Sequence, residues 1–473
     1  MNYQAIWIGG GAAGRFGSSY MKALGGKQLV IEKEDHLGGK CCKNACVLQH
    51  FLFDQTVELD QFRMFSGKMW YPKFEGRVDI VPIIKAFREG RELVYKLMNW
   101  QSKEQLSLEF ILYKECKIVD PHTVEVEGKK FTTENLVIGT GARPYTPDLP
   151  GSDLERVLNY EGLANLDFEP KKVVVVGGGK IGSGYASFFN ACGCDTTIID
   201  QKPILTFLDQ DIRHTAIDFM KKRGIKIYEN ALVKEIKGGP TVESVEAIVD
   251  GRKKDFVADT VFLATGVIPN SEMAKGINVK IGPMNEIVVN KRMQTNIPGV
   301  YAIGDVTGPP YEMYKARKSG MIAAKNIMGD KAELDIDFAP DFMLTTYEIA
   351  WAGLTEEEAR KKYKNISIIR MPPAESPPFP VVLPMAERSM NFGHLKPGWS
   401  GLIKEIIDAD SRKILGFHGI GFGIKDAFQY LAQFLKQGIT IDELANMNEL
   451  FLNPEHFIQL SRLRAGQKKL KSL

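Results

Sequence analysis

Two apolar runs, each followed at once by glycines, set the pattern of the chain. Ala5–Ile8 is apolar throughout, and Val173–Val176 consists only of valine. Continuous apolar runs of this length predict strands that are buried on both faces of a parallel sheet. Each run leads through a glycine loop into a stretch with helical spacing. The pattern therefore predicts two strand–loop–helix–strand units and an α/β fold.

The first loop places Gly9, Gly11 and Gly14 at the spacing GxGxxG. Such glycines permit a tight turn and let a pyrophosphate approach the N-terminus of the following helix. The next predicted strand, Gln28–Ile31, is followed by Glu32, whose carboxylate can accept a hydrogen bond from a ribose hydroxyl. The strand, the loop and the acid together favour a dinucleotide site over a merely structural glycine turn.

The second loop repeats the spacing with Gly177, Gly179 and Gly182, and its next strand ends at Asp200. Two such units predict two dinucleotides bound by one chain. Asp200 suits a free 2′-hydroxyl and repels a 2′-phosphate, which favours NADH over NADPH, whereas the neighbouring Lys202 works in the opposite direction. Both nicotinamide cofactors therefore stay open.

A short stretch behind the first unit carries three of the six cysteines. Cys41 and Cys46 are candidates for a redox pair, with a structural disulfide or a metal pair as alternatives. The sequence offers no second cluster with zinc-ligand spacing, so no metal is expected. Cys42 is predicted to be incidental, although an extra thiol there could compete in thiol exchange. The remaining cysteines are predicted to be reduced and buried: Cys116, Cys192 and Cys194.

Composition and charge argue against several classes of protein. A net charge of +3 is too small to predict nucleic acid binding. No apolar run approaches the roughly 20 residues that span a bilayer, so no membrane association is expected. The N-terminal residues lead directly into a predicted strand, so no signal peptide is expected either. Because so few cysteines in so long a chain do not form a secreted disulfide framework, a cytoplasmic location is predicted.

Four features occur together: the paired glycine loops, the cysteine spacing, the Thr140-Gly141 and Thr265-Gly266 steps, and the run Ala302–Asp305. In combination they resemble the FAD-dependent pyridine nucleotide–disulfide oxidoreductases over essentially the whole chain. The resemblance implies two Rossmann-like dinucleotide-binding domains, for FAD and NAD(P), plus an α+β C-terminal dimerisation domain. The expected bounds are 1–152 and 275–337 for the two parts of the FAD domain, 153–274 for the NAD(P) domain and 338–473 for the dimerisation domain.

The same resemblance implies the cofactors and their ligands. FAD and either NADPH or NADH are expected, in a homodimer whose active site is shared between subunits. Gly39, Gly141 and Asp305 join the first loop and Glu32 at the FAD site, Asp305 through a ribityl hydroxyl, and Gly266 joins the second loop and Asp200 at the NAD(P) site. Cys46 becomes the flavin-proximal thiol and Cys41 the thiol that meets the substrate.

The C-terminal stretch departs from the family pattern. Reductases of this family carry a His, followed five positions later by a Glu, and the His serves as general acid/base at the partner's thiols. Here Phe451 and His456 occupy these positions. The exchange resembles one branch of the family, the 2-ketopropyl-coenzyme M oxidoreductases/carboxylases. An enolate that must react with carbon dioxide cannot lie beside a general acid, because the acid would protonate the enolate before carbon dioxide adds to it.

This second resemblance implies a reaction. Reducing equivalents pass from NAD(P)H through FAD to the cysteine pair, and Cys41 attacks a 2-ketoalkyl thioether. Carbon dioxide then traps the enolate as acetoacetate. The residues assigned to the substrate are Arg15 and Arg317 for a sulfonate, Met313 for the pocket lining, and His456 and Gln459 for the enolate or carboxylate.

Some residues and alternatives stay open. Gly184 and Lys180 depart from the family pattern, and Lys43 stands where the carboxylases are expected to carry a His. Lys43 could lower a thiolate pKa or bind a different anion. One alternative function is a disulfide, persulfide or mercuric reductase, which the loss of the acid at Phe451 would slow. A flavoprotein redox sensor without turnover is a further alternative.

Overall fold

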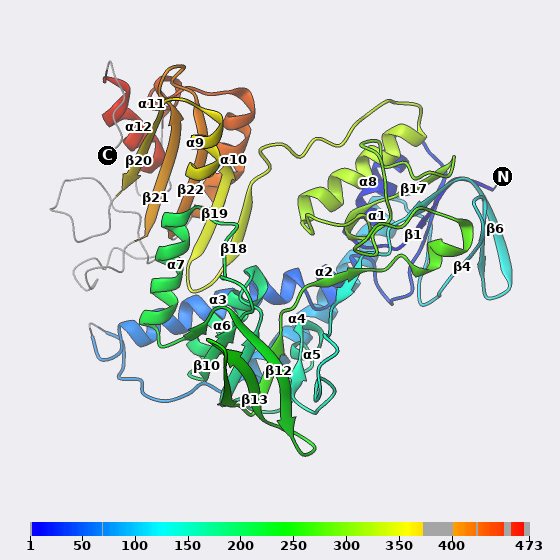
Figure 1. The fold of residues 1–473 in the computed structure, drawn as a ribbon. Helices are drawn as coiled ribbons and strands as arrows, with labels where there is room; N and C mark the ends of the chain where they lie inside the picture. The colour runs from blue at the N-terminus through cyan, green and yellow to red at the C-terminus, as the bar shows by residue number, and fades with distance from the viewer. Residues whose placement is uncertain (1, 69, 372–400, 422–423, 449–455, 468–473) are drawn as a thin grey trace.

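The structure is a computed structural model that describes residues 2–68, 70–371, 401–421, 424–448 and 456–467. One seven-stranded and two five-stranded sheets organise this part of the chain. In Figure 1 the first sheet lies at the right with the N-terminus, the second at the lower centre, and the third at the upper left with the C-terminus. The predicted fold class, α/β with an α+β C-terminal part, is confirmed.

The first sheet has the order β3-β2-β1-β6-β5-β4, and β17 pairs with β6 as well. Its strands are β1 (Tyr3–Ile8), β2 (Gln28–Ile31), β3 (Phe110–Ile111), β4 (Lys117–Asp120), β5 (Thr123–Val126), β6 (Lys129–Ile138) and β17 (Val300–Ala302). The centre of the sheet is parallel, and its apolar residues are buried on both faces. Helices α1 (Ala12–Ala23) and α8 (Met313–Ile327) pack side by side, as Figure 1 shows.

The second sheet, β11-β10-β9-β15-β8, is parallel throughout. Its strands are β8 (Val157–Leu158), β9 (Lys172–Val176), β10 (Asp195–Ile199), β11 (Lys226–Tyr228) and β15 (Thr260–Leu263). The four valines of β9 are at most 8% exposed, and a fully buried valine contributes about 1.5–3 kcal/mol. Nearby lie helices α5 (Tyr160–Leu163), α6 (Lys180–Ala191) and α7 (Gln210–Lys222), and a meander of β12 (Ala231–Gly238), β13 (Val242–Val249) and β14 (Arg252–Val257).

The third sheet is antiparallel, in the order β18-β19-β22-β21-β20. Its strands are β18 (Asp341–Leu344), β19 (Glu348–Gly353), β20 (Ile366–Met371), β21 (Leu402–Asp408) and β22 (Ile414–Gly421). Its helices are α9 (Glu356–Lys362), α10 (Ile424–Gln437), α11 (Ile441–Ala445) and α12 (His456–Ala465). Helix α10 packs on β19 and β22, and α12 packs on α11 and β21.

The helices that follow β2 in the chain connect the first sheet to the second. A short helix, α2 (Gly39–Lys43), is followed directly by α3 (Cys46–Met64), and then by α4 (Ile80–Trp100) and a π-helical turn, η1 (Gln101–Gln105). Helix α3 packs against α6 of the second sheet. Within the described residues, no helix is long and apolar enough to cross a membrane. The cytoplasmic location stays a prediction.

Candidate functional site

The first glycine loop is shaped by contacts that only glycine permits. Gly9 has a φ of +101°, and a Cβ there would overlap the carbonyl of Gly139; a Cβ at Gly14 would overlap the carbonyl of Gly9. The amide of Gly10 donates to Glu32 Oε2 at 2.8 Å. Gly11 caps α1, and a Cβ there would make only an ordinary contact, 3.9 Å from Gly39 Cα. The N-terminus of α1 and the anchored carboxylate therefore fit the pyrophosphate and ribose of a dinucleotide.

The second loop repeats this geometry. A Cβ at Gly182 would overlap the carbonyl of Gly177, while Gly179 faces open space. The amide of Gly178 donates to Asp200 Oδ2 at 2.7 Å, and the amide of Lys202 donates to Asp200 Oδ1 at 2.8 Å. The carboxylate of Asp200 thus lies at the end of β10, beside the loop, where it can meet a ribose.

We expect Asp200→Ser to shift the cofactor preference towards NADPH by about tenfold in the ratio of kcat/KM values, because the carboxylate repels a 2′-phosphate. The wild-type chain should prefer NADH. Asp195→Ser is the matched control, since Asp195 begins the same strand and pairs with Lys226 on the surface. Steady-state rates with both nucleotides measure the ratio. A wild-type preference for NADPH would contradict this role of Asp200.

The two Thr-Gly steps lie at opposite ends of one short antiparallel strand pair, with Gly141 opposite Asn270 and Gly266 opposite Tyr145. Gly141 and Gly266 both have positive φ, +69° and +106°, with open space at their Cβ positions. The strands that follow them, β7 (Ala142–Pro144) and β16 (Val267–Pro269), pair in antiparallel fashion. Asp305, in the 3-10 turn Gly304–Thr307, follows β17. Burial raises the pKa of Asp305, and Lys315 opposes that shift, so a hydrogen-bonding ligand there would satisfy a carboxyl group that is largely removed from water.

The cysteine stretch is attached to the first loop. The amide of Gly38 donates to the carbonyl of Gly10 at 2.8 Å. Gly39 has a φ of +60°, and a Cβ there would come within 2.8 Å of Gly11 Cα. This close contact brings α2 against the N-terminal end of α1. The sulfurs on α2 and at the start of α3 therefore lie at the candidate FAD site.

All six cysteines are free thiols in the structure. Hydrogen bonds from Cys41 to Cys42 and Cys46, together with burial, raise the pKa of the Cys41 thiol well above its usual value. Cys46 is the first residue of α3. Lys40, between the loop and the sulfurs, forms an ion pair with Glu161 of α5. Because Glu161 is distant in sequence, no local pattern could have predicted this pair.

The two arginines expected at the substrate both lie near Cys42. Arg15 is buried, and it donates from Nε to Ser102 Oγ at 2.8 Å and from Nη2 to Gln101 Oε1 at 2.5 Å. Arg317 is exposed on α8, with its guanidinium 4.5 Å from the centre of the Phe16 ring. Both cations lower the pKa of Cys42. Met313 is the first residue of α8, one turn before Arg317.

Cys42 does not have the incidental place expected for it. Its hydrogen bond with Cys41 lowers its pKa to about 7; burial opposes the shift, and the charges of Arg15 and Arg317 contribute to it. By contrast, burial raises the pKa of Cys116 and Cys194 to about 12. The resemblance already places both arginines at the substrate, but their proximity to Cys42 follows only from the structure.

The remaining cysteines are placed mostly as expected. Cys192 and Cys194 are buried, and burial raises the pKa of each. Cys116 is only partly buried, because it precedes β4 near the rim of the first sheet. None of the three is close to the chemistry of α2.

The residues expected from the partner subunit are not brought to the cysteines within one chain. Phe451 lies outside the described residues. His456 and Gln459 belong to α12, at the far end of the molecule from α2 in Figure 1. Only a second subunit could therefore bring α12 to this site.

Two of the three residues left open by the sequence are lysines, and each forms an ion pair. Lys43 donates to Glu34 Oε2 at 2.6 Å, so its charge is already paired. Lys180 donates to Glu312 Oε1 and Asp341 Oδ1, both at 2.5 Å, and so ties the second loop to α8 and β18. These pairings make ion-pair formation the structural role of both lysines.

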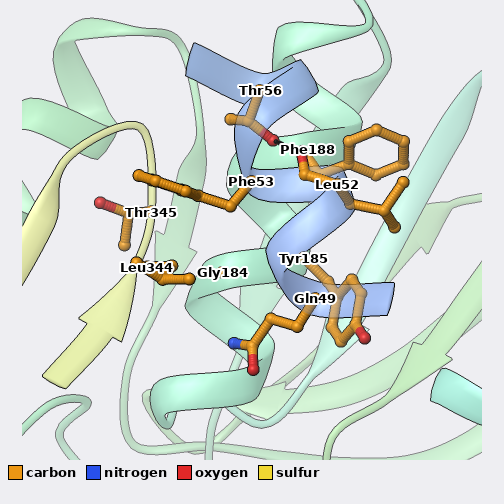
Figure 2. A pocket seen from close by; sticks show the side chains of 9 residues that line it. All are labelled: Gln49, Leu52, Phe53, Thr56, Gly184, Tyr185, Phe188, Leu344 and Thr345. Atoms are coloured by element: carbon orange, nitrogen blue, oxygen red, sulfur yellow. Dashed lines mark hydrogen bonds between the residues drawn. The ribbon is translucent and has the colours of Figure 1, made fainter. Parts of the chain in front are cut away.

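Gly184 allows a close approach between α6 and the third sheet. A Cβ there would lie 2.6 Å from the carbonyl of Leu344. Figure 2 shows the small cavity at this junction, which α3, α6 and the β18–β19 turn enclose. Its volume of about 10 Å³ suits one water molecule at most. The cavity is a packing gap rather than a substrate pocket.

Comparison with known proteins identifies the class. The family model for pyridine nucleotide-disulphide oxidoreductases matches residues 3–320, and the model for the dimerisation domain of the same family matches residues 339–457. The chain therefore belongs to the pyridine nucleotide–disulfide oxidoreductases. It is an enzyme of the FAD-dependent, NAD(P)H-using type, with a dimerisation domain.

The relatives differ in what they act on. A dihydrolipoyl dehydrogenase of Mycoplasma pneumoniae is 28% identical over 94% of both chains. A mercuric reductase of Lysinibacillus sphaericus is 28% identical over 98% of this chain and 82% of its own length. A glutathione reductase of Nostoc sp. is 27% identical over 93% of this chain and 95% of its own length. The HOCl-induced flavoprotein disulfide reductase RclA from Escherichia coli has the same fold, with a TM-score of 0.83 at 21% identity over 98% and 100% of the two chains.

Proposed function

We propose that the chain is an NAD(P)H-dependent reductive carboxylase, which cleaves a 2-ketoalkyl thioether and carboxylates the resulting enolate to acetoacetate. The observation that carries the proposal is the guanidinium pair of Arg15 and Arg317 beside the cysteines. A sulfonate needs fixed donors and positive charge, and guanidinium groups supply both. A thioether whose carrier ends in a sulfonate would then present its sulfur to Cys41.

The anchoring of Arg15 supports this role. Two of its nitrogens are held by η1, so the guanidinium is already oriented before a ligand arrives. Preorganised charge binds an anion at a lower cost in side-chain entropy. Arg317 stands exposed on the neighbouring helix and completes the pair.

The chemistry of the cysteines is a balanced exchange. The Cys41 thiolate attacks the thioether sulfur, a sulfur–sulfur bond forms and the carbon–sulfur bond breaks, and its electron pair leaves with the ketone as an enolate. The Cys46 thiolate then attacks Cys41, which releases the carrier thiol and forms the Cys41–Cys46 disulfide. Bound FAD supplies the two electrons from NAD(P)H that restore the dithiol.

The enolate needs protection from protons until it meets carbon dioxide. Phe451 stands where family members carry their acid, and we propose that it removes that acid and helps to exclude water. His456 and Gln459 of the partner subunit would act near the enolate or carboxylate, and Met313 would line the pocket. The active site would accordingly be shared across a homodimer.

The test supplies the holoenzyme with 2-ketopropyl-coenzyme M, NAD(P)H and labelled bicarbonate. We expect label in acetoacetate. Phe451→His is expected to move the product ratio towards acetone, because an acid returns to the enolate. Phe451→Leu, which adds no acid, is the matched control. Absence of label with full FAD content would overturn the carboxylase proposal. An unchanged product ratio in Phe451→His would show that Phe451 does not protect the enolate from protonation.

The second candidate function is reduction of a small disulfide that carries an acidic group. The names of the relatives, which include a glutathione reductase, favour it. In this function the same arginine pair would bind a carboxylate rather than a sulfonate. Rapid reduction of oxidised glutathione, with no cleavage of the thioether, would decide for this second function.

A further inference from the structure

Arg15 is a buried cation that no carboxylate neutralises within the part of the chain that the structure describes. Its side chain belongs to a residue that is only 8% exposed. Its hydrogen-bond partners are two neutral oxygens, Ser102 Oγ and Gln101 Oε1. Charged side chains that are buried this deeply are ordinarily paired with an opposite charge. The negative partner of Arg15 is therefore expected to be a ligand.

The two hydrogen bonds of Arg15 use one side of its guanidinium group. Nε donates to Ser102 Oγ at 2.8 Å, and Nη2 donates to Gln101 Oε1 at 2.5 Å. Nε and Nη2 are the donors along one side of the rigid, planar fork, and Nη1 lies on the other side. Among the described residues, none accepts a hydrogen bond from Nη1. Nη1 is therefore the nitrogen that is left for a ligand.

The acceptor of the Nε bond is itself fixed in place. Ser102 is fully buried, and its Oγ donates to the carbonyl of Met98, one turn earlier in α4, at 2.7 Å. The amide of Leu108 donates to the Ser102 carbonyl at 2.9 Å. Gln101 and Ser102 both belong to the π-helical turn η1, and such turns are rare and occur frequently at functional sites. The turn therefore presents two consecutive, well-anchored acceptors to one arginine.

We propose that Gln101 and Ser102 are the positioning residues of an anion subsite: they hold the Nε and Nη2 side of Arg15 and leave Nη1 for the negative end of the substrate. The inference rests on the proposed function, in which Arg15 binds the anionic group of the carrier. Because both residues are neutral, they orient the cation without cancelling its charge. The full charge of the guanidinium is thus kept for the ligand.

The second cation makes a neutral anchor necessary. Burial lowers the pKa of Arg15, and the charge of Arg317 adds to that shift, whereas Cys42 opposes it. Arg317 is exposed on α8, with the Phe16 ring as its contact. A bound anion would relieve the repulsion between the two guanidinium groups. The subsite is accordingly expected to select an anionic group over a neutral group of similar size.

The test measures binding in the absence of turnover. The oxidised holoenzyme, without NAD(P)H, is titrated calorimetrically with 2-ketopropyl-coenzyme M and with an analogue that carries a hydroxyl group in place of the sulfonate. We expect the wild type to bind the sulfonate at least about tenfold more tightly. Ser102→Ala should lower this ratio of dissociation constants about fivefold, because Arg15 loses one of its two anchors. Gln101→Glu should abolish the preference, because its carboxylate would neutralise Arg15.

Binding of the hydroxyl analogue should be unchanged in both variants, which separates positioning of the cation from general damage to the fold. Ser187→Ala is the matched control. Ser187 of α6 is also buried, and its Oγ donates to the carbonyl of Ser183, one turn earlier, at 2.9 Å. FAD content reports on folding, and Gln101→Glu nearly preserves side-chain size in case Ser102→Ala does not fold.

The outcomes separate this inference from the proposed function. Equal binding of the two probes by the wild type would overturn the inference, and so would an unchanged ratio in a folded Ser102→Ala or Gln101→Glu variant. Sulfonate-selective binding that both variants weaken, together with no labelled acetoacetate from the reduced enzyme, would support the inference and overturn only the carboxylation.

Discussion

Cys46→Ser is expected to lower steady-state turnover about a thousandfold or more, because the thiolate that resolves the mixed disulfide is lost. The first half-reaction should survive. Cys41 still carries its sulfur, so one equivalent of thioether would react and leave the carrier thiol bound to Cys41. Mass spectrometry of the intact chain measures this adduct, and its stoichiometry should approach one per subunit.

Cys41→Ser completes the experiment. It should abolish both turnover and the adduct, because no thiolate then attacks the thioether sulfur. Cys194→Ser is the control, since Cys194 is buried just before β10 and burial raises its pKa to about 12. An adduct on Cys46 or Cys42 instead of Cys41 would reverse the assignment of the attacking thiol.

Lys404→Met is expected to destabilise the fold by about 3–5 kcal/mol, because it leaves the buried carboxylate of Asp209 without its lysine partner, whereas Asp211 and Glu356 keep Arg370. Lys404 of β21 is 1% exposed. Its Nζ lies 2.7 Å from Asp209 Oδ1, 2.6 Å from Asp211 Oδ2 and 2.7 Å from Glu356 Oε2. These contacts join the third sheet to the start of α7, which belongs to the second.

The loss of stability in Lys404→Met should depend on pH. Burial alone would raise the pKa of Asp211 and Glu356, but hydrogen bonds with Lys404 hold both below their usual values. In the wild type, this stabilisation is present above the ordinary carboxyl range and is lost as the pH falls through the depressed values. In Lys404→Met the two carboxylates lose one of their cations but keep Arg370, so their pKa values rise. The difference between variant and wild type should therefore shrink on acidification.

Urea unfolding of the holoenzyme at pH 7.5 and at about pH 3.5 measures both effects, because only the lower pH lies below the ordinary carboxyl range. Lys226→Met is the matched control, because Lys226 forms only a surface pair with Asp195, which is worth about 0–1 kcal/mol. Equal losses in the free energy of unfolding in Lys404→Met and Lys226→Met would show that the cluster around Lys404 does not join the two sheets.

Local sequence patterns were sufficient to predict the parallel sheets and their glycine loops. In both units the apolar run forms a central strand, and the acid at the end of the next strand accepts from a loop amide. These features depend on residues that are close in sequence and on backbone conformations that only glycine adopts easily. The family and its cofactors followed from them.

The pairing of distant side chains could not be predicted in this way. Glu161 and Ser102 reach the site from segments with no motif of their own. Cys42 gains its environment only because α1 and α8 pack side by side. Likewise, the Lys404 cluster exists because the third sheet docks on α7, and no sequence spacing indicates that contact.

The sequence by itself determined the two dinucleotide-binding units, the cysteine spacing and the exchange of His for Phe at 451, because each is a short-range pattern with a direct chemical reason. The tertiary structure alone decided which charges surround which sulfur. Electrostatic effects on a thiol depend on distance and burial, and these are determined only by the packing of α1 against α8, two helices that are far apart in sequence.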